Sequence, residues 1–112
     1  MFKKCPMCRH AWIDREDFLA DPDVEIIGYQ VSFDSVKEGL FLFNHHCETT
    51  LAFKVLEFED LYEGARSDIA AAGTDNCSGF CLNIKELRAC STQCKYAYAR
   101  DIIKIILSWP KR

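Results

Sequence analysis

Seven cysteines, most of them in closely spaced pairs, are the feature that most constrains how this 112-residue chain can fold. The pairs are Cys5 with Cys8, Cys77 with Cys81, and Cys90 with Cys94. The seventh cysteine, Cys47, directly follows two histidines. An odd number of cysteines leaves one thiol over in a fully disulfide-bonded monomer, so disulfides alone do not explain the pattern.

The spacing of these cysteines predicts metal coordination. Zinc sites use four tetrahedral ligands, mostly Cys and His, and often take them as cysteines two to four residues apart. Seven cysteines and one histidine supply enough ligands for two closed zinc sites. The histidine is His45 or His46, and we prefer His46. The predicted ligands are Cys5, Cys8, His46, Cys47, Cys77, Cys81, Cys90 and Cys94.

Two ways of sharing these ligands stay open. In the local arrangement, one ion is held by the ligands Cys77, Cys81, Cys90 and Cys94. The other ion then has the ligands Cys5, Cys8, Cys47 and a histidine, and the short loops favour this choice because they cost less entropy to close. In the alternative, the tight N-terminal turn with Cys5 and Cys8 (a zinc knuckle) shares an ion with Cys90 and Cys94. This arrangement resembles a treble-clef zinc site. Cys77 and Cys81 would then join Cys47 and a histidine.

The cysteines also bear on the cellular compartment and on other chemistries. The N-terminus has no apolar signal segment, so we expect a cytoplasmic, reducing compartment, where paired cysteines more often bind metal than form disulfides. An iron–sulfur redox or electron-transfer protein stays open as an alternative. So does an enzyme with an open metal site beside Cys47 and His46. A cysteine such as Cys94 can also be a small buried apolar residue.

Composition limits the remaining classes of protein. The length fits a single domain, residues 1–112. A formal charge of −3 and a pI of about 5.6 give no basic footprint for nucleic acid. No segment approaches the roughly 20 apolar residues that a membrane span needs. We therefore expect a protein partner, with neither nucleic acid nor a membrane involved.

The hydrophobic pattern predicts a small antiparallel sheet of about three strands. Residues 24–33 alternate, with Ile27, Tyr29, Val31 and Phe33 on one face. Residues 40–43 and 49–56 predict the other strands. Read without a break, 40–56 would be too long for one strand, so residues 44–48 are expected to form a turn or bulge.

Helices are predicted before and after these strands in the sequence. Asp14 can cap a short helix over residues 15–20, and residues 57–63 have helical spacing. The longest helix is expected from residue 91 or 92 to about 109, which places Cys94 in its first turn, where backbone N–H groups stabilise a thiolate. The predicted fold is α+β, with the sheet packed on this long C-terminal helix and Cys-rich loops at its edges. The apolar stripe of this helix is Cys94, Tyr98, Ile102, Ile105, Ile106 and Trp109, widened by Ile103 and Leu107.

Three segments together resemble small Cys-rich bacterial proteins that carry no assigned activity. They are residues 44–52 (NHHCETTLA), 58–62 (FEDLY) and 77–81 (CSGFC). The resemblance implies a bacterial metal-binding module and no specific reaction. The hypothesis from sequence is therefore a small soluble zinc-binding domain, with one or two mainly structural ions, that acts through protein–protein interaction.

Overall fold

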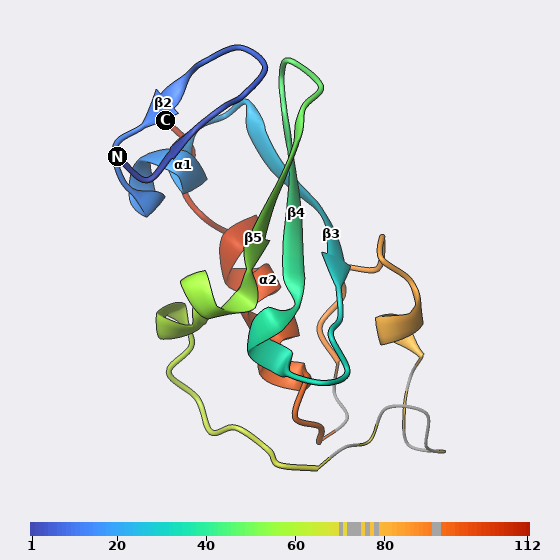
Figure 1. Cartoon of the computed structure of the whole chain (residues 1–112). Helices are drawn as coiled ribbons and strands as arrows, with labels where there is room; N and C mark the ends of the chain where they lie inside the picture. Colours follow the sequence, from blue (N-terminus) through green and yellow to red (C-terminus); the bar gives the residue numbers. More distant parts are fainter. Residues whose placement is uncertain (70, 72–74, 76, 78, 91–92) are drawn as a thin grey trace.

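A three-stranded antiparallel sheet and one C-terminal helix form the centre of the molecule (Figure 1). The strands β3 (Val24–Gln30), β4 (Leu40–His45) and β5 (Thr50–Lys54) lie in sequence order, with β4 in the middle. The helix α2 (Ala97–Leu107) packs its apolar side chains into the same core. This computed structural model describes residues 1–69, 71, 75, 77, 79–90 and 93–112. The predicted α+β class and three-stranded antiparallel sheet are confirmed.

The N-terminal segment forms a second, smaller sheet followed by a short helix. Strands β1 (Lys3–Lys4) and β2 (Ala11–Trp12) pair antiparallel, and α1 (Arg15–Ala20) follows them. The predicted cap is confirmed, because the Asp14 side chain accepts a 2.7 Å hydrogen bond from the Asp17 backbone N–H. The helix thereby presents its buried face, Phe18 and Leu19, to the core.

The remaining described elements are single turns of 3-10 helix. They are η1 (Val36–Glu38), η2 (Val55–Glu57), η3 (Glu59–Leu61) and η4 (Phe80–Leu82). The helix expected over 57–63 is therefore two 3-10 turns, which still bury Phe58 completely. The sequence also predicts that Ser67 caps a short turn through residues 70–72, and this segment lies partly outside the described residues.

A β-bulge in β3 changes which side chains of this strand face the core. Ile26 pairs with Phe43 and Gly28 with Leu42, so Ile27 is an extra residue with no partner in the register. Val24 and Ile26 are buried before the bulge and Tyr29 after it, whereas Ile27 is 38% exposed. The prediction that Ile27 shares a buried face with Tyr29 was wrong.

The bulge coincides with a close contact from a distant segment. The backbone N–H of Tyr29 donates to the carbonyl oxygen of Ile84 at 2.8 Å. A Cβ on Gly28 would lie only 3.0 Å from that same oxygen. Glycine is therefore required here, because the segment that carries Ile84 approaches the backbone of β3 directly.

Helix α2 is shorter than the sequence predicted. It begins at Ala97 and spans 11 residues, so Cys94 lies ahead of the helix and not in its first turn. Before the helix, the chain is held by other bonds: Lys95 N–H donates to Ile69 O at 2.7 Å, and the Tyr96 hydroxyl donates to Phe33 O at 3.0 Å. The predicted start at 91 or 92 lies outside the described residues.

The apolar stripe of α2 is largely confirmed. Its buried members in α2 are Tyr98, Ile102, Ile103 and Ile106, and Ala99, which was not predicted, is buried as well. Leu107, expected at the margin of the stripe, is 55% exposed. Within the described part of the chain, no helix combines the length and apolar content that crossing a bilayer requires.

The C-terminal residues tie the end of α2 back to the N-terminal half of the chain. The Lys111 ammonium donates to the carbonyl oxygens of Leu19 at 2.8 Å and Val24 at 2.9 Å. The Arg112 backbone N–H donates to Ala20 O at 2.8 Å. The bonds to Leu19 and Ala20 satisfy carbonyl groups at the C-terminal end of α1, and the bond to Val24 reaches the first residue of β3. The two chain ends lie close together in Figure 1.

The bulge predicts different losses of stability when two neighbouring isoleucines, Ile26 and Ile27, are replaced by alanine. Ile26→Ala should lower the free energy of unfolding by about 2–5 kcal/mol, because it leaves a cavity beside Phe43. The matched control, Ile27→Ala, should cost about 1 kcal/mol or less. Urea unfolding measures both values, and a larger loss for Ile27→Ala would contradict the register.

Candidate metal centre

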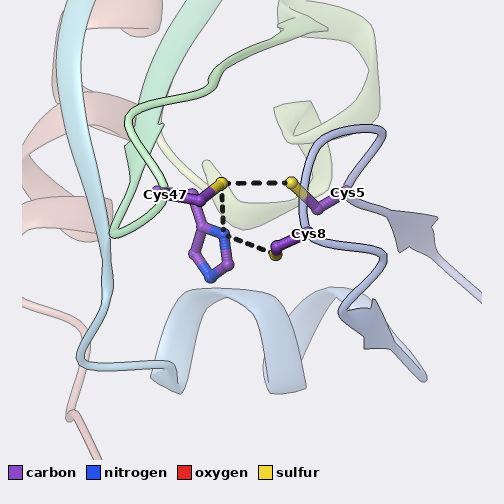
Figure 2. Close-up of side chains that lie close together, drawn as sticks. Cys5, Cys8 and Cys47 are labelled. Atoms are coloured by element: carbon purple, nitrogen blue, oxygen red, sulfur yellow. Dashed lines mark hydrogen bonds between the residues drawn. The ribbon is translucent and has the colours of Figure 1, made fainter.

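Three cysteines and one histidine from two distant segments meet at one end of the main sheet. Cys5 and Cys8 come from the loop between β1 and β2, His45 ends β4, and Cys47 lies in the turn before β5. One ligand atom from each of the four lies within 4.8 Å of all the others. Figure 2 shows the sulfurs of Cys5 and Cys8 on one loop facing Cys47 on the other. Among the described residues, this is the only such group of three or more His, Cys, Asp or Glu side chains.

The loop that carries Cys5 and Cys8 is a tight turn closed by backbone hydrogen bonds. The Cys5 N–H donates to His10 O at 2.7 Å, and the Arg9 N–H donates to Cys5 O at 2.9 Å. Arg9 has a φ of 65°, a left-handed conformation that turns the chain back toward β2. Pro6 fixes its own φ within this turn. The loop therefore holds both sulfurs on one side.

The second pair of ligands is positioned by strand β4 and its turn. Phe41, Phe43 and His45 alternate along β4 and all three are buried, so His45 is the last inward-facing residue of the strand. The turn that follows is closed by a bond from His45 N–H to Thr49 O at 3.0 Å, with Glu48 at a φ of 67°. This reversal returns Cys47 to the side of His45.

The distances between the ligand atoms fit one tetrahedral ion. The Cys5 and Cys47 sulfurs are 3.5 Å apart, and His45 Nδ1 lies 3.5 Å from the Cys8 sulfur and 3.4 Å from the Cys47 sulfur. Ligands bound at about 2.0–2.3 Å from one zinc ion lie about 3.3–3.8 Å from each other. The Cys5 and Cys47 sulfurs are also too far apart to be a disulfide, and none of the seven cysteines forms a disulfide.

A buried indole supports the imidazole ring from behind. The Trp12 ring lies edge-on to His45, with the ring centroids 5.0 Å apart, and both side chains are almost completely buried. Trp12 Nε1 donates to Asp21 Oδ2 at 2.9 Å, which satisfies the indole inside the core. Burial raises the pKa of Asp21, but the bonds from Trp12 and from the Asp23 backbone lower it more.

The knuckle favours a thiolate at its first cysteine. Burial raises the pKa of Cys5, but backbone N–H groups of Cys8 and Met7, with His45 and Cys47, lower it further, to about 5. The backbone N–H of His10 lowers the pKa of Cys8, but burial and the nearby Cys5 and Cys47 sulfurs raise it more. The neighbouring sulfurs thus oppose a second negative charge so close to the first.

The hairpin turn lowers the pKa of Cys47 and raises the pKa of His45. The Thr49 hydroxyl lies 3.1 Å from the Cys47 sulfur and is the main cause that lowers the pKa of Cys47, against the effect of burial. Burial lowers the pKa of His45, but the Cys47 and Cys5 sulfurs raise it more. Without metal, a proton on His45 offsets the sulfur charge; a divalent cation can take over that role.

The structure brings together only part of the predicted ligand set. Cys5, Cys8 and Cys47 meet as the local arrangement expects, which differs from the treble-clef alternative. The histidine at this site is His45 and not the preferred His46, which is exposed and lies 3.6 Å from an Asp23 carboxylate oxygen. Metal binding by these residues stays a prediction.

The other four cysteines do not form a comparable group among the described residues. Cys94 is buried in a small apolar cluster with Ala71 and Tyr96, and Cys81 packs against that cluster. Cys77 and Cys90 are half-buried. Their role as ligands therefore stays a prediction.

The sequence analysis missed two features of the site formed by Cys5, Cys8, His45 and Cys47. One is the alternation of inward and outward side chains along β4, which turns His45 inward. The other is the Thr49 hydroxyl beside the Cys47 sulfur.

Comparisons with protein families, with curated proteins and with solved structures found no match to this chain. The functional argument therefore depends on the geometry of the site itself.

Thr49 provides a test of how the hydrogen-bond shell supports this site. Thr49→Val keeps the shape of the side chain but removes the hydroxyl beside Cys47, so affinity for zinc should fall about 10- to 100-fold. Thr50→Val, at an exposed position on β5, is the matched control and should bind as the wild type does. Competition with a chromophoric chelator measures both; equal affinities would contradict the assigned role of Thr49.

Proposed function

We propose that this protein is a small zinc-binding domain in which Cys5, Cys8, His45 and Cys47 hold one structural zinc ion. The observation that carries the proposal is the convergence of these four ligand atoms within 4.8 Å of one another, with three of their separations at 3.4 or 3.5 Å. Three thiolates and an imidazole are a ligand set that suits zinc.

The number of ligands favours a structural over a catalytic ion. Structural zinc sites have four protein ligands, whereas catalytic sites keep one position open for water or substrate. Here two ligands come from the N-terminal loop and two from the β4–β5 turn, so the ion would join the small sheet to the main one. The same reasoning disfavours an enzyme that uses Cys47 with His46, because His46 points to Asp23 at the surface.

The close approach of the ligands also favours a single ion over an iron–sulfur cluster. A cluster distributes its cysteines over different iron atoms, so their sulfurs stand further apart than the ligands of one ion. All four ligand atoms here lie within 4.8 Å of each other. Zinc is therefore the proposed cofactor.

If the ion is structural, it does not take part in a reaction, and the function of the domain depends on what its surface binds. We propose that the domain works through contact with a protein partner in a reducing, cytoplasmic compartment. The formal charge of −3 supports a partner other than nucleic acid. A reducing compartment fits a chain in which none of the seven cysteines forms a disulfide.

Two adjacent histidines test the assignment of the ligand. His45→Ala should lower the zinc content by one ion per chain, because it removes one of four ligands. His46→Ala is the matched control and should keep the wild-type zinc content, since this exposed ring lies outside the group. Elemental analysis after anaerobic gel filtration provides the measurement. Loss of zinc in His46→Ala with retention in His45→Ala would contradict the proposed site.

Removal of the metal tests the structural role. Structural zinc supplies about 10–16 kcal/mol in zinc-finger peptides, which equals or exceeds the typical net stability of a domain, about 5–15 kcal/mol. Chelation should therefore lower the melting temperature strongly and expose Trp12, whose fluorescence can be followed in a Trp109→Phe background. Added zinc should restore both signals. An unchanged thermal transition after verified zinc removal would overturn the structural role.

A further inference from the structure

Arg100 is a completely buried arginine without a carboxylate partner. Its side chain extends from α2 and is 0% exposed. Nη1 donates to the carbonyl oxygens of Glu86 at 2.7 Å and Arg88 at 3.4 Å. Every Asp and Glu of the chain lies in the described part, yet none is paired with this guanidinium, and the Glu86 carboxylate pairs with Arg88 instead. The Glu86 carboxylate therefore acts on Arg100 only at longer range, and the direct contacts of the guanidinium are with carbonyl oxygens, a sulfur and two aromatic rings.

The surroundings of Arg100 contain further unsatisfied polar atoms. Neither Arg100 Nε nor the Tyr29 hydroxyl has a hydrogen-bond partner, although both atoms are buried. The faces of two aromatic rings, Tyr29 and Phe80, lie 5.3 and 5.6 Å from the guanidinium carbon. A buried charge without a counter-charge is costly, and buried cations are normally paired. The site therefore calls for a negative group.

The nearest candidates for negative charge are sulfurs. Arg100 Nη2 donates to the Cys81 sulfur at 3.8 Å. Cys81 in turn packs against the cluster that contains the buried Cys94. Cys77 and Cys94 both lie close enough to Cys81 to act on it electrostatically. The pKa of the Cys81 thiol is raised, mainly because this thiol is partly buried. Protonated thiols cannot neutralise Arg100, whereas metal-bound thiolates can.

The turn that carries Cys77 shares a feature with the first knuckle. The Gly79 N–H donates to the Cys77 sulfur at 3.4 Å, two residues along the chain. In the first knuckle, the Met7 N–H bonds in the same way to the Cys5 sulfur. Gly79 has a φ of 81°, so this turn uses a left-handed residue, as the first turn does at Arg9. Backbone N–H groups directed at sulfur stabilise thiolates.

From this arrangement we infer a second metal centre, a zinc site held by Cys77, Cys81, Cys90 and Cys94, with Arg100 as its buried counter-charge. Zinc bound to four thiolates has a net charge of −2, which the guanidinium offsets in part. Four thiols lose four protons to solvent as four Zn–S bonds form, so no oxidant or reductant is involved. These sulfurs do not lie within 4.8 Å as a group among the described residues, so the ion would draw them together. Arg100 is a positioning residue and not a ligand.

This inference stands apart from the proposed function, because the two sites share no residue. The zinc count per chain, measured by native mass spectrometry under anaerobic reducing conditions, tests both. The wild type should hold two ions, and Cys5→Ser and Cys81→Ser should each hold one. A wild-type count of one that Cys81→Ser leaves unchanged would overturn the second site while sparing the first. A count of two that Cys81→Ser and Cys94→Ser both leave at two would also overturn it. If the serine variants fail to fold, the wild-type count and Arg100→Met decide together: a count of two supports the second site, and a count of one whose affinity Arg100→Met leaves unchanged overturns it.

Arg100 itself is tested by binding affinity. Arg100→Met should weaken binding of the second ion about 10- to 100-fold, as expected for a group that supports metal ligands, and leave the first ion unchanged. Lys104→Met, at an exposed position on the same helix, is the matched control and should change neither affinity. Stepwise zinc titration against a competing chelator resolves the two ions. Equal weakening of both ions, or of neither, would overturn the role assigned to Arg100.

Discussion

The close approach of three cysteine sulfurs, which disfavours negative charge on all three at once, is the constraint on which the N-terminal half of this structure depends. Cys5, Cys8 and Cys47 are brought together with His45 by two tight turns. Buried thiolates in contact are unfavourable without a cation, because desolvation and like charge act in the same direction. A divalent ion bound to these four residues would remove that conflict and join the two sheets.

This joint is continuous with the hydrophobic core. The inward face of β4 contains Phe41, Phe43 and His45 in succession, so the same strand supplies core residues and a ligand. Trp12 packs between His45 and Phe18, with centroid distances of 5.0 and 4.9 Å. Loss of the metal is therefore expected to loosen the packing around the first strands, and loss of that packing to weaken the metal site.

The sequence predicted what depends on local spacing and missed what depends on distant contacts. The Cys5 and Cys8 knuckle and the α1 cap follow from neighbouring residues, and both are found where expected. The choice of His45 over His46 depends on how far β4 extends before its turn. The exposure of Ile27 depends on a bulge beside Ile84, a residue from a distant segment of the chain. Periodicity carries no information on such contacts.

The central claim is that three thiolates and the His45 imidazole bind one zinc ion, and X-ray absorption at the zinc edge of the anaerobically purified protein tests it most directly. The account predicts sulfur neighbours at about 2.3 Å together with an imidazole nitrogen at about 2.0–2.1 Å. This nitrogen is expected whether or not a second, all-sulfur site is also filled. A zinc shell of sulfur alone, or a protein that carries iron in place of zinc, would contradict the account.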